Sequence, residues 1–103
     1  IYASADGGRS FALDSEGLPA GADFFETNIW GVGAELARTT DGTAYAHSLR
    51  RGEVWRRRAG ESAWQRLAFP APDQRTIGQT YALATAPHDP ALVFVATLGD
   101  GLW

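Results

Sequence analysis

Four acidic residues lie in or beside one long connection of the chain, and they are the side chains that could carry acid–base chemistry. Paired carboxylates cleave glycosidic bonds when their carboxyl groups stand roughly 5–9.5 Å apart. The connection from 14 to 27 could bring such a pair to one face of a folded domain, but sequence spacing does not set that separation. No catalytic residue is therefore assigned. The four acids are Asp14, Glu16, Asp23 and Glu26.

Five arginines form the most basic stretch of the chain. In an extended strand Arg56 and Arg58 would share one face and Arg57 would take the other, so Arg56 and Arg58 are candidate contacts for an acidic partner. A structural role is favoured over this one, because charged side chains at a sheet edge prevent further strands from pairing there. The five are Arg50, Arg51, Arg56, Arg57 and Arg58, with Glu53 among them.

The tryptophans and histidines could serve ligand or metal binding. Trp30 has no tryptophan counterpart in the repeat described below, so Trp30 is the candidate ligand contact. The other three recur at matching repeat positions, which favours packing between sheets. His47 falls in an expected strand and His88 in an expected turn, with no further ligands grouped around them. We therefore expect no metal site and no cofactor.

The composition excludes several classes of function. The chain has 103 residues and a net charge of -3, which argues against general nucleic-acid binding. No apolar run approaches the roughly 18 residues that span a bilayer. Without cysteine, disulfides and thiolate chemistry are excluded. The compartment is not indicated, and the absence of methionine suggests a piece of a longer chain or a processed product.

Short runs of β-type residues separated by turns dominate the chain, and helix signals are weak. Twelve glycines and five prolines interrupt it, and the pair Asp41-Gly42 is a strong hairpin-turn signal. Many short strands at close spacing are typical of a sandwich, a barrel or a propeller. The expected strands cover 1–4, 10–13, 28–32, 43–47, 53–56, 63–67, 81–84 and 92–96.

Two internal alignments indicate a repeat of about 50 residues. Without a gap, 1–11 lies over 54–64 at an offset of 53, and 41–55 lies over 89–103 at an offset of 48. Identities are few, but an apolar strand, a glycine-containing turn and an aromatic residue recur. A unit of roughly 40–50 residues with four short strands is the period of a propeller blade, whereas a sandwich would not be expected to repeat in this way.

The stretch SADGGRSF places a serine, an aspartate, a glycine and an aromatic residue at the spacing Ser/Thr-x-Asp-x-Gly-x-x-Trp/Phe. With this motif and the repeat, the chain resembles the Asp-box, or bacterial neuraminidase repeat, family of β-propellers. Residues 52–67 are similar to a decayed second box in which Trp64 keeps the aromatic position. The residues of the intact motif and its turn are Ser4, Asp6, Gly7, Gly8 and Phe11.

The residue types of this turn predict a structural role. Asp6 can accept hydrogen bonds from turn amides, and Ser4 can bond locally. Gly7 and Gly8 permit positive φ angles, and Phe11 is expected to pack between sheets. The resemblance adds that such turns lie on the rim of the propeller, away from the central channel where substrates usually bind.

The resemblance implies an all-β fold made of propeller blades of four antiparallel strands, with about two blade-equivalents present. In this family the box lies between the third and fourth strands of a blade. Residues 1–27 would then end one blade, 28–79 would form a complete blade, and 80–103 would start another. Propellers typically have four to eight blades. The expected partners are therefore the remaining blades of a longer chain, which the ragged ends favour, or other copies of this chain.

Two functions are compatible with this resemblance. The favoured one is a non-catalytic scaffold whose loops bind a protein or glycan ligand, as in sortilin-type receptors and photosystem II assembly factors. The alternative is a fragment of a glycoside hydrolase resembling a sialidase or a xyloglucanase. A sialidase needs an arginine triad, a tyrosine nucleophile with a glutamate partner and an acid/base aspartate. That set cannot be assembled here, because Tyr2, Tyr45 and Tyr81 all have the pattern of ordinary strand residues.

Overall fold

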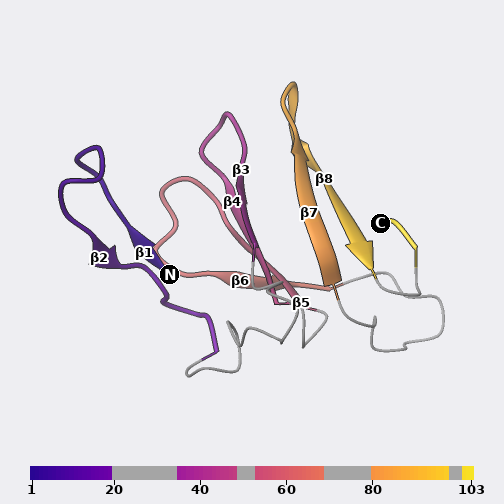
Figure 1. Ribbon diagram of the computed structural model, residues 1–103, viewed down its shortest axis with the longest axis horizontal. Helices are drawn as coiled ribbons and strands as arrows, with labels where there is room; N and C mark the ends of the chain where they lie inside the picture. The colour runs from indigo at the N-terminus through magenta and orange to yellow at the C-terminus, as the bar shows by residue number, and fades with distance from the viewer. Residues whose placement is uncertain (20–34, 49–52, 69–79, 98–100) are drawn as a thin grey trace.

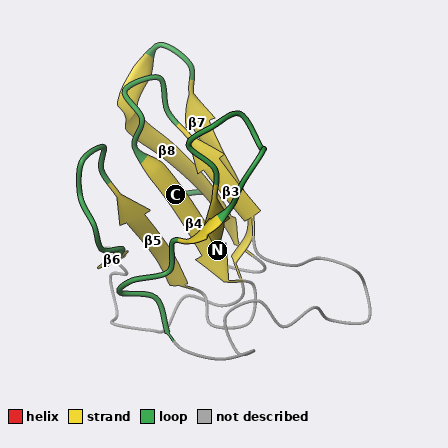
Figure 2. Cartoon of the chain, turned by 90° about the vertical axis from the view of Figure 1, so that its left-hand side faces the viewer, coloured by secondary structure: helices red, strands yellow, loops and turns green. Residues whose placement is uncertain are grey.

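The computed structural model consists of β-strands, turns and loops. It describes residues 1–19, 35–48, 53–68, 80–97 and 101–103. The strands in these ranges form three antiparallel sheets (Figure 1), and no helix occurs among them (Figure 2). The expected all-β fold is confirmed. Across the same ranges, no helical segment has the length and hydropathy of a membrane span.

The three sheets follow one another along the chain and lie side by side (Figure 1). The first sheet pairs β1 (Tyr2–Ala3) with β2 (Ala12–Leu13). The middle sheet has the order β3-β4-β5-β6, formed by Glu35–Arg38, Ala44–Ser48, Glu53–Arg57 and Gln65–Leu67. The third sheet pairs β7 (Thr80–Ala86) with β8 (Asp89–Thr97).

The middle sheet corrects one strand assignment. Its first strand is Glu35–Arg38, whereas the sequence predicted that strand at 28–32, which lies outside the described residues. The segment 35–38 was missed because it has one strongly apolar residue, Leu36, between two charged ones. Tertiary pairing against β4 overrides this weak local preference. The other expected strands that fall in the described ranges are present, with ends shifted by a few residues.

A first apolar core lies between the first and middle sheets. Ala46 of β4 and Trp64, which directly precedes β6, are buried in it, and Ile1, Leu18 and Trp55 pack against them. Ile1 and Leu18 flank the first hairpin, one at each end. The face of the middle sheet that carries Ala46 and Trp55 is thus directed toward the preceding sheet in the chain.

A second core lies between the middle and third sheets. Tyr45 and Val54 come from the middle sheet and Val95 from the third, and all three are buried. Neighbouring residues of a strand point to opposite faces of its sheet. Tyr45 and Ala46, which are adjacent in β4, therefore enter different cores, and the middle sheet is covered on both faces.

Residues 101–103 continue the third sheet beyond β8. Leu102 forms a bridge with Ala96. Val95 and Trp103 exchange two main-chain hydrogen bonds, of 2.9 and 3.0 Å. Trp103 packs against the second core. Its pairing with β8 agrees with the expectation that this segment starts a third strand.

The pairing of β1 with β2 has the same register as the pairing of β5 with β6. Tyr2 lies opposite Leu13 in the first pair, and Trp55 lies opposite Arg66 in the second. Trp55 lies 53 positions after Tyr2, and Arg66 lies 53 positions after Leu13. That is the offset at which the two sequence segments align.

The pairing of β7 with β8 can be compared with that of β3 with β4. Leu36 lies opposite Ala46, and Leu83 lies opposite Val95. Ala46 lies opposite Trp55 in the next strand, as Val95 lies opposite Trp103. Each set of three paired residues forms a row across its sheet. Each row faces the preceding sheet, since Ala46 enters the first core and Val95 enters the second.

This comparison corrects the second alignment by one residue. The ungapped overlay at an offset of 48 predicted Phe94 as the equivalent of Ala46, whereas strand pairing assigns Val95 to that place. The physical reason is a shorter connection. Nine positions separate Ala46 from its partner Trp55, and eight separate Val95 from Trp103.

Candidate functional site

The hairpin between β1 and β2 turns around one carboxylate. Asp6 Oδ1 accepts the main-chain N–H groups of Arg9 and Ser10 at 3.0 and 2.9 Å, and Asp6 Oδ2 accepts the Ser10 hydroxyl at 2.6 Å. The Ser4 hydroxyl donates to Asp6 Oδ1 at 2.8 Å and accepts the N–H of Gly8 at 2.7 Å. The local bonds that the sequence predicted for Ser4 and Asp6 are present.

The backbone and charge of this turn agree with a structural role. Gly7 and Gly8 have φ angles of 74° and 88°, a region that residues with a Cβ rarely adopt. The hydroxyl and amide of Ser10, followed by the hydroxyl of Ser4, hold the pKa of Asp6 far below its usual range. Asp6 is therefore ionised at neutral pH and has no proton to donate.

A second carboxylate organises the hairpin between β3 and β4. Asp41 Oδ1 accepts the hydroxyl of Thr39 and the main-chain N–H of Thr43. Thr39 and Thr43 are themselves buried, at 7% and 5% exposure. The Thr39 hydroxyl, followed by the Thr43 amide, lowers the pKa of Asp41. The sequence identified this hairpin turn but not its hydroxyl–carboxylate bonds.

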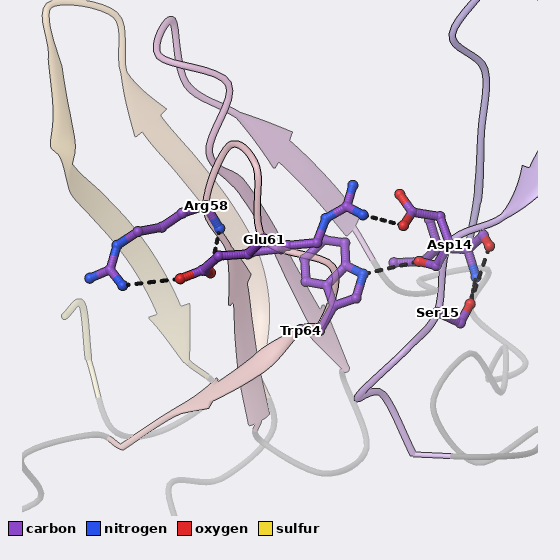
Figure 3. Close-up of polar contacts among 7 residues, drawn as sticks. Asp14, Ser15, Arg58, Glu61 and Trp64 are labelled. Carbon is purple, nitrogen blue, oxygen red and sulfur yellow. Dashed lines mark hydrogen bonds and ion pairs between the residues drawn. The ribbon is translucent and has the colours of Figure 1, made fainter.

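The hairpin between β5 and β6 also contains a carboxylate, but this one follows the main-chain amide that it binds, whereas Asp6 precedes the amides that it binds. Glu61 Oε2 accepts the main-chain N–H of Arg58 at 2.9 Å, and Glu61 Oε1 lies 3.4 Å from the Arg58 guanidinium (Figure 3). The bond from the Arg58 amide is the main cause that lowers the pKa of Glu61. In the alignment Ala59 replaces Asp6, so the acid of the turn is supplied two positions later.

The hairpin tips of the three sheets lie on one side of the molecule, at the top of Figure 1. Three of these tips contain Asp6, Asp41 and Glu61, each held by groups of its own turn. In the described ranges no three histidine or acidic side chains are grouped to hold a metal ion.

A polar joint connects the first hairpin to the middle sheet (Figure 3). The indole Nε1–H of Trp64 donates to the main-chain carbonyl of Asp14 at 3.0 Å, and the main-chain N–H of Trp64 donates to Glu16 at 2.8 Å. Arg57 forms an ion pair with the Asp14 carboxylate and lies over the Trp64 ring, 5.4 Å from its centroid. Asp14 is thus a structural partner of Arg57.

The acids of the long connection are only partly described. Asp14 is neutralised by Arg57, so it does not present a free carboxylate for glycosidic chemistry. The main chain of Glu16 accepts a bond from Trp64. Asp23 and Glu26 lie outside the described residues.

The structure assigns local roles to the arginines of the candidate patch. Arg56 lies in β5, opposite Tyr45 and Gln65. Arg58 lies beyond the end of β5 at Arg57, so the prediction that it shares a strand face with Arg56 is wrong. Glu61 holds Arg58 in the turn instead. Arg50 and Arg51 are outside the described residues.

The aromatic predictions have mixed outcomes. Trp64 is buried in the first core, Trp55 packs against it, and Trp103 packs against the second core. These three positions confirm the prediction of packing between sheets. Phe11, however, is 64% exposed, so the expected burial of Phe11 is wrong within this chain, because no further sheet lies beyond β1 and β2 in the described structure. Trp30 lies outside the described residues.

The two histidines lie in the kinds of element that the sequence predicted, one in a strand and one in a turn. His47 lies in β4 and is fully buried, and His88 lies in the turn between β7 and β8. Comparison with known proteins adds no further assignment. No family model, no curated protein and no solved structure matches the chain.

Proposed function

We propose that this chain is a non-catalytic scaffold of the Asp-box β-propeller type, whose loops bind a protein or glycan ligand in the assembled propeller. The observation that carries the proposal is the recurrence of one strand register at the offset of the sequence repeat. Tyr2 with Leu13 and Trp55 with Arg66 occupy the same places in their hairpins, 53 residues apart.

The stacking of the sheets supports the same architecture. In a propeller every blade turns the same face toward its predecessor. The row of Ala46 and Trp55 faces the first sheet, and the corresponding row of Val95 and Trp103 faces the middle sheet. Equivalent rows therefore face the same way along the chain, as successive blades would.

The electrostatics of the turns favour a scaffold over a glycoside hydrolase. A general acid needs a carboxyl group whose pKa is raised toward the working pH, whereas the pKa values of Asp6, Asp41 and Glu61 are all lowered by bonds within their turns. Asp14 is engaged by Arg57. These carboxylates stabilise turns, which is what a rigid support for ligand-binding loops requires.

The experiment that tests the proposal measures turnover of two glycosidic substrates and the strand register of the chain. The chain is incubated with sialyllactose and with a xyloglucan oligosaccharide, and release of sugar is measured beside the Asp14→Asn and Glu16→Gln variants. We expect no turnover by any of the three proteins. Hydrolysis that is lost in either variant would replace the scaffold with an enzyme. Backbone NMR of the same samples should show cross-strand contacts between Tyr2 and Leu13 and between Trp55 and Arg66, and their absence would remove the architectural basis.

A further inference from the structure

The first sheet has one apolar face that none of the described residues covers. Ile1 packs into the first core, so the next residue, Tyr2, points away from the middle sheet, and Leu13 lies directly opposite Tyr2. Tyr2 and Leu13 are 68% and 71% exposed, and Phe11 near them is 64% exposed. Large apolar side chains gathered on one face in this way mark an interaction surface.

The third sheet has an uncovered apolar face on its opposite side. Val93 and Val95 point into the second core, and the alternating residues Leu92 and Phe94 are 42% and 39% exposed. In the described part of the chain, the middle sheet has an exposed apolar residue as well. Leu36 of β3 lies in the row of Ala46 that faces the first sheet, yet it is 57% exposed.

The two end sheets are complementary halves of the middle sheet. The first sheet has the register of β5 and β6, and the third sheet pairs two antiparallel strands as β3 and β4 do, with a connection two residues longer between the paired positions of the row. The first sheet reaches the middle sheet through Ile1 and Leu18, which pack against Ala46 and Trp64, whereas Leu36 on β3 stays exposed. A four-stranded sheet in the place of the first sheet would also cover Leu36.

We propose that the first hairpin of a second copy of this chain pairs with the edge of β8 and completes a four-stranded sheet with the order β7-β8-β1-β2. The inference rests on the proposed function and names the partner that assembles the scaffold. By equivalence with Ala46 opposite Trp55, Tyr2 of the second copy lies opposite Val95. Ala3 of that copy then lies opposite Phe94.

The hydrogen-bonding directions of the two edges agree with this register. The carbonyl of Ile1 accepts the N–H of Asp14, so Ile1 directs its peptide groups toward β2. Successive residues of a strand direct these groups to alternate edges. Tyr2 therefore directs its N–H and C=O to the open edge, and Val95 directs its own toward the strand beside β8, where they now meet Trp103.

The residues that the new hairpin must displace are few. The edge of β8 is occupied by a bridge at Leu102, by the two main-chain bonds of Trp103, and by two bonds from the amide and hydroxyl of Thr97 to the carbonyl of Gly101. Leu102 is 68% exposed, so displacing it uncovers little apolar surface, and Tyr2 of the second copy enters the place of Trp103 in the second core. The proposed interface joins β1 of one copy to β8 of another, so it is head to tail. Such an interface generates a closed ring if the rotation between successive copies closes, and an open array if it does not.

Cysteine cross-linking tests the register, because the chain contains no cysteine. Ala3→Cys and Phe94→Cys proteins are made separately, mixed and oxidised. The pair is of the type that lies closest in antiparallel sheets, with Cα atoms about 4.5 Å apart, within the range of a disulfide. We expect a disulfide-linked heterodimer. The matched control mixes Ala3→Cys with Val93→Cys, whose side chain is on the opposite face, and should give several-fold less product.

The mass of the native chain in solution is the second measurement. Light scattering on a sizing column should show a discrete assembly of two or more copies, and Leu13→Glu should return it to monomer with an unchanged β-sheet circular dichroism spectrum. A monomeric native chain, or equal cross-linking in both mixtures, would overturn the inference. If either outcome were found while the NMR contacts of β1–β2 and β5–β6 were present, the proposed function would still stand. If those contacts were absent, the proposed function would fail together with the inference.

Discussion

The indole of Trp64 and the main-chain carbonyl of Asp14, 50 residues apart in sequence, are joined by a hydrogen bond of 3.0 Å. Trp64 is 4% exposed and also fills the first core. One side chain thus supplies both the apolar contact and the polar contact that fix the first hairpin to the middle sheet.

Replacing Trp64 separates these two contributions. Trp64→Phe keeps an aromatic ring but leaves the Asp14 carbonyl without its donor, so we expect a loss of about 1–3 kcal/mol in the free energy of unfolding. Trp64→Ala should cost about 3–5 kcal/mol, because it also leaves a cavity. Denaturant unfolding measures both. An unchanged stability of Trp64→Phe would mean that the hydrogen bond contributes nothing, and equal losses in the two variants would mean that packing of the ring contributes nothing.

Gly17 provides a test of close packing at the same joint. Its φ is 86°, and a Cβ added there would clash with the Trp64 carbonyl oxygen. Gly17→Ala should therefore combine a backbone cost of about 1–2 kcal/mol with an overpacking cost of about 1–3 kcal/mol. Gly7→Ala is the matched control, since φ is 74° and nothing lies within 4 Å of its added Cβ. Similar losses in the two variants would contradict the close approach.

The ion pair of Arg57 and Asp14 should show measurable coupling. Their side chains are 24% and 18% exposed, against 56% and 30% for Arg58 and Glu61. A double-mutant cycle with Arg57→Gln and Asp14→Asn should give a coupling of about 0.5–1 kcal/mol that weakens with salt. The same cycle on Arg58 and Glu61 should give less, and the reverse order would refute the assignment of Arg57 to the joint.

The turn carboxylates predict a loss of stability in acid. The pKa values of Asp6, Asp41 and Glu61 are lower in the folded chain than their ordinary values. Protons therefore bind the unfolded chain more readily, so the stabilisation is complete above the unfolded pKa values near 4 and is lost as the pH falls through the folded ones. Asp6→Asn should flatten the decline of thermal midpoint below about pH 4, whereas an unchanged profile would exclude Asp6 as a contributor.

Much of the fold could be predicted from the sequence, because turn residues and the period-two pattern are local signals. Asp41-Gly42 marked a real hairpin, and the alignment at an offset of 53 matches a strand register. The strand at 35–38 could not be predicted, since its apolar content is one leucine and its pairing with β4 is a tertiary effect.

The candidate site was less predictable, because its contacts join distant parts of the chain. No local pattern indicates that Arg57 would select Asp14, or that Trp64 would donate to the carbonyl of Asp14. In the sequence Glu61 is only a residue that departs from the Asp-box motif. In the structure its carboxylate accepts the Arg58 amide and so stabilises the turn. Exposure of Phe11 depends on whether another sheet covers it, which the motif does not specify.

The linear stacking of the sheets has a consequence for cooperativity. Each sheet packs against its sequence neighbours, so the free energy of the array is close to a sum of nearest-neighbour terms. The first hairpin has two short strands and a single neighbour, held at the joint of Asp14 and Trp64. Its amide hydrogens should therefore exchange through local opening, while those of β4 and β5, which are covered on both faces, exchange only when the whole array unfolds.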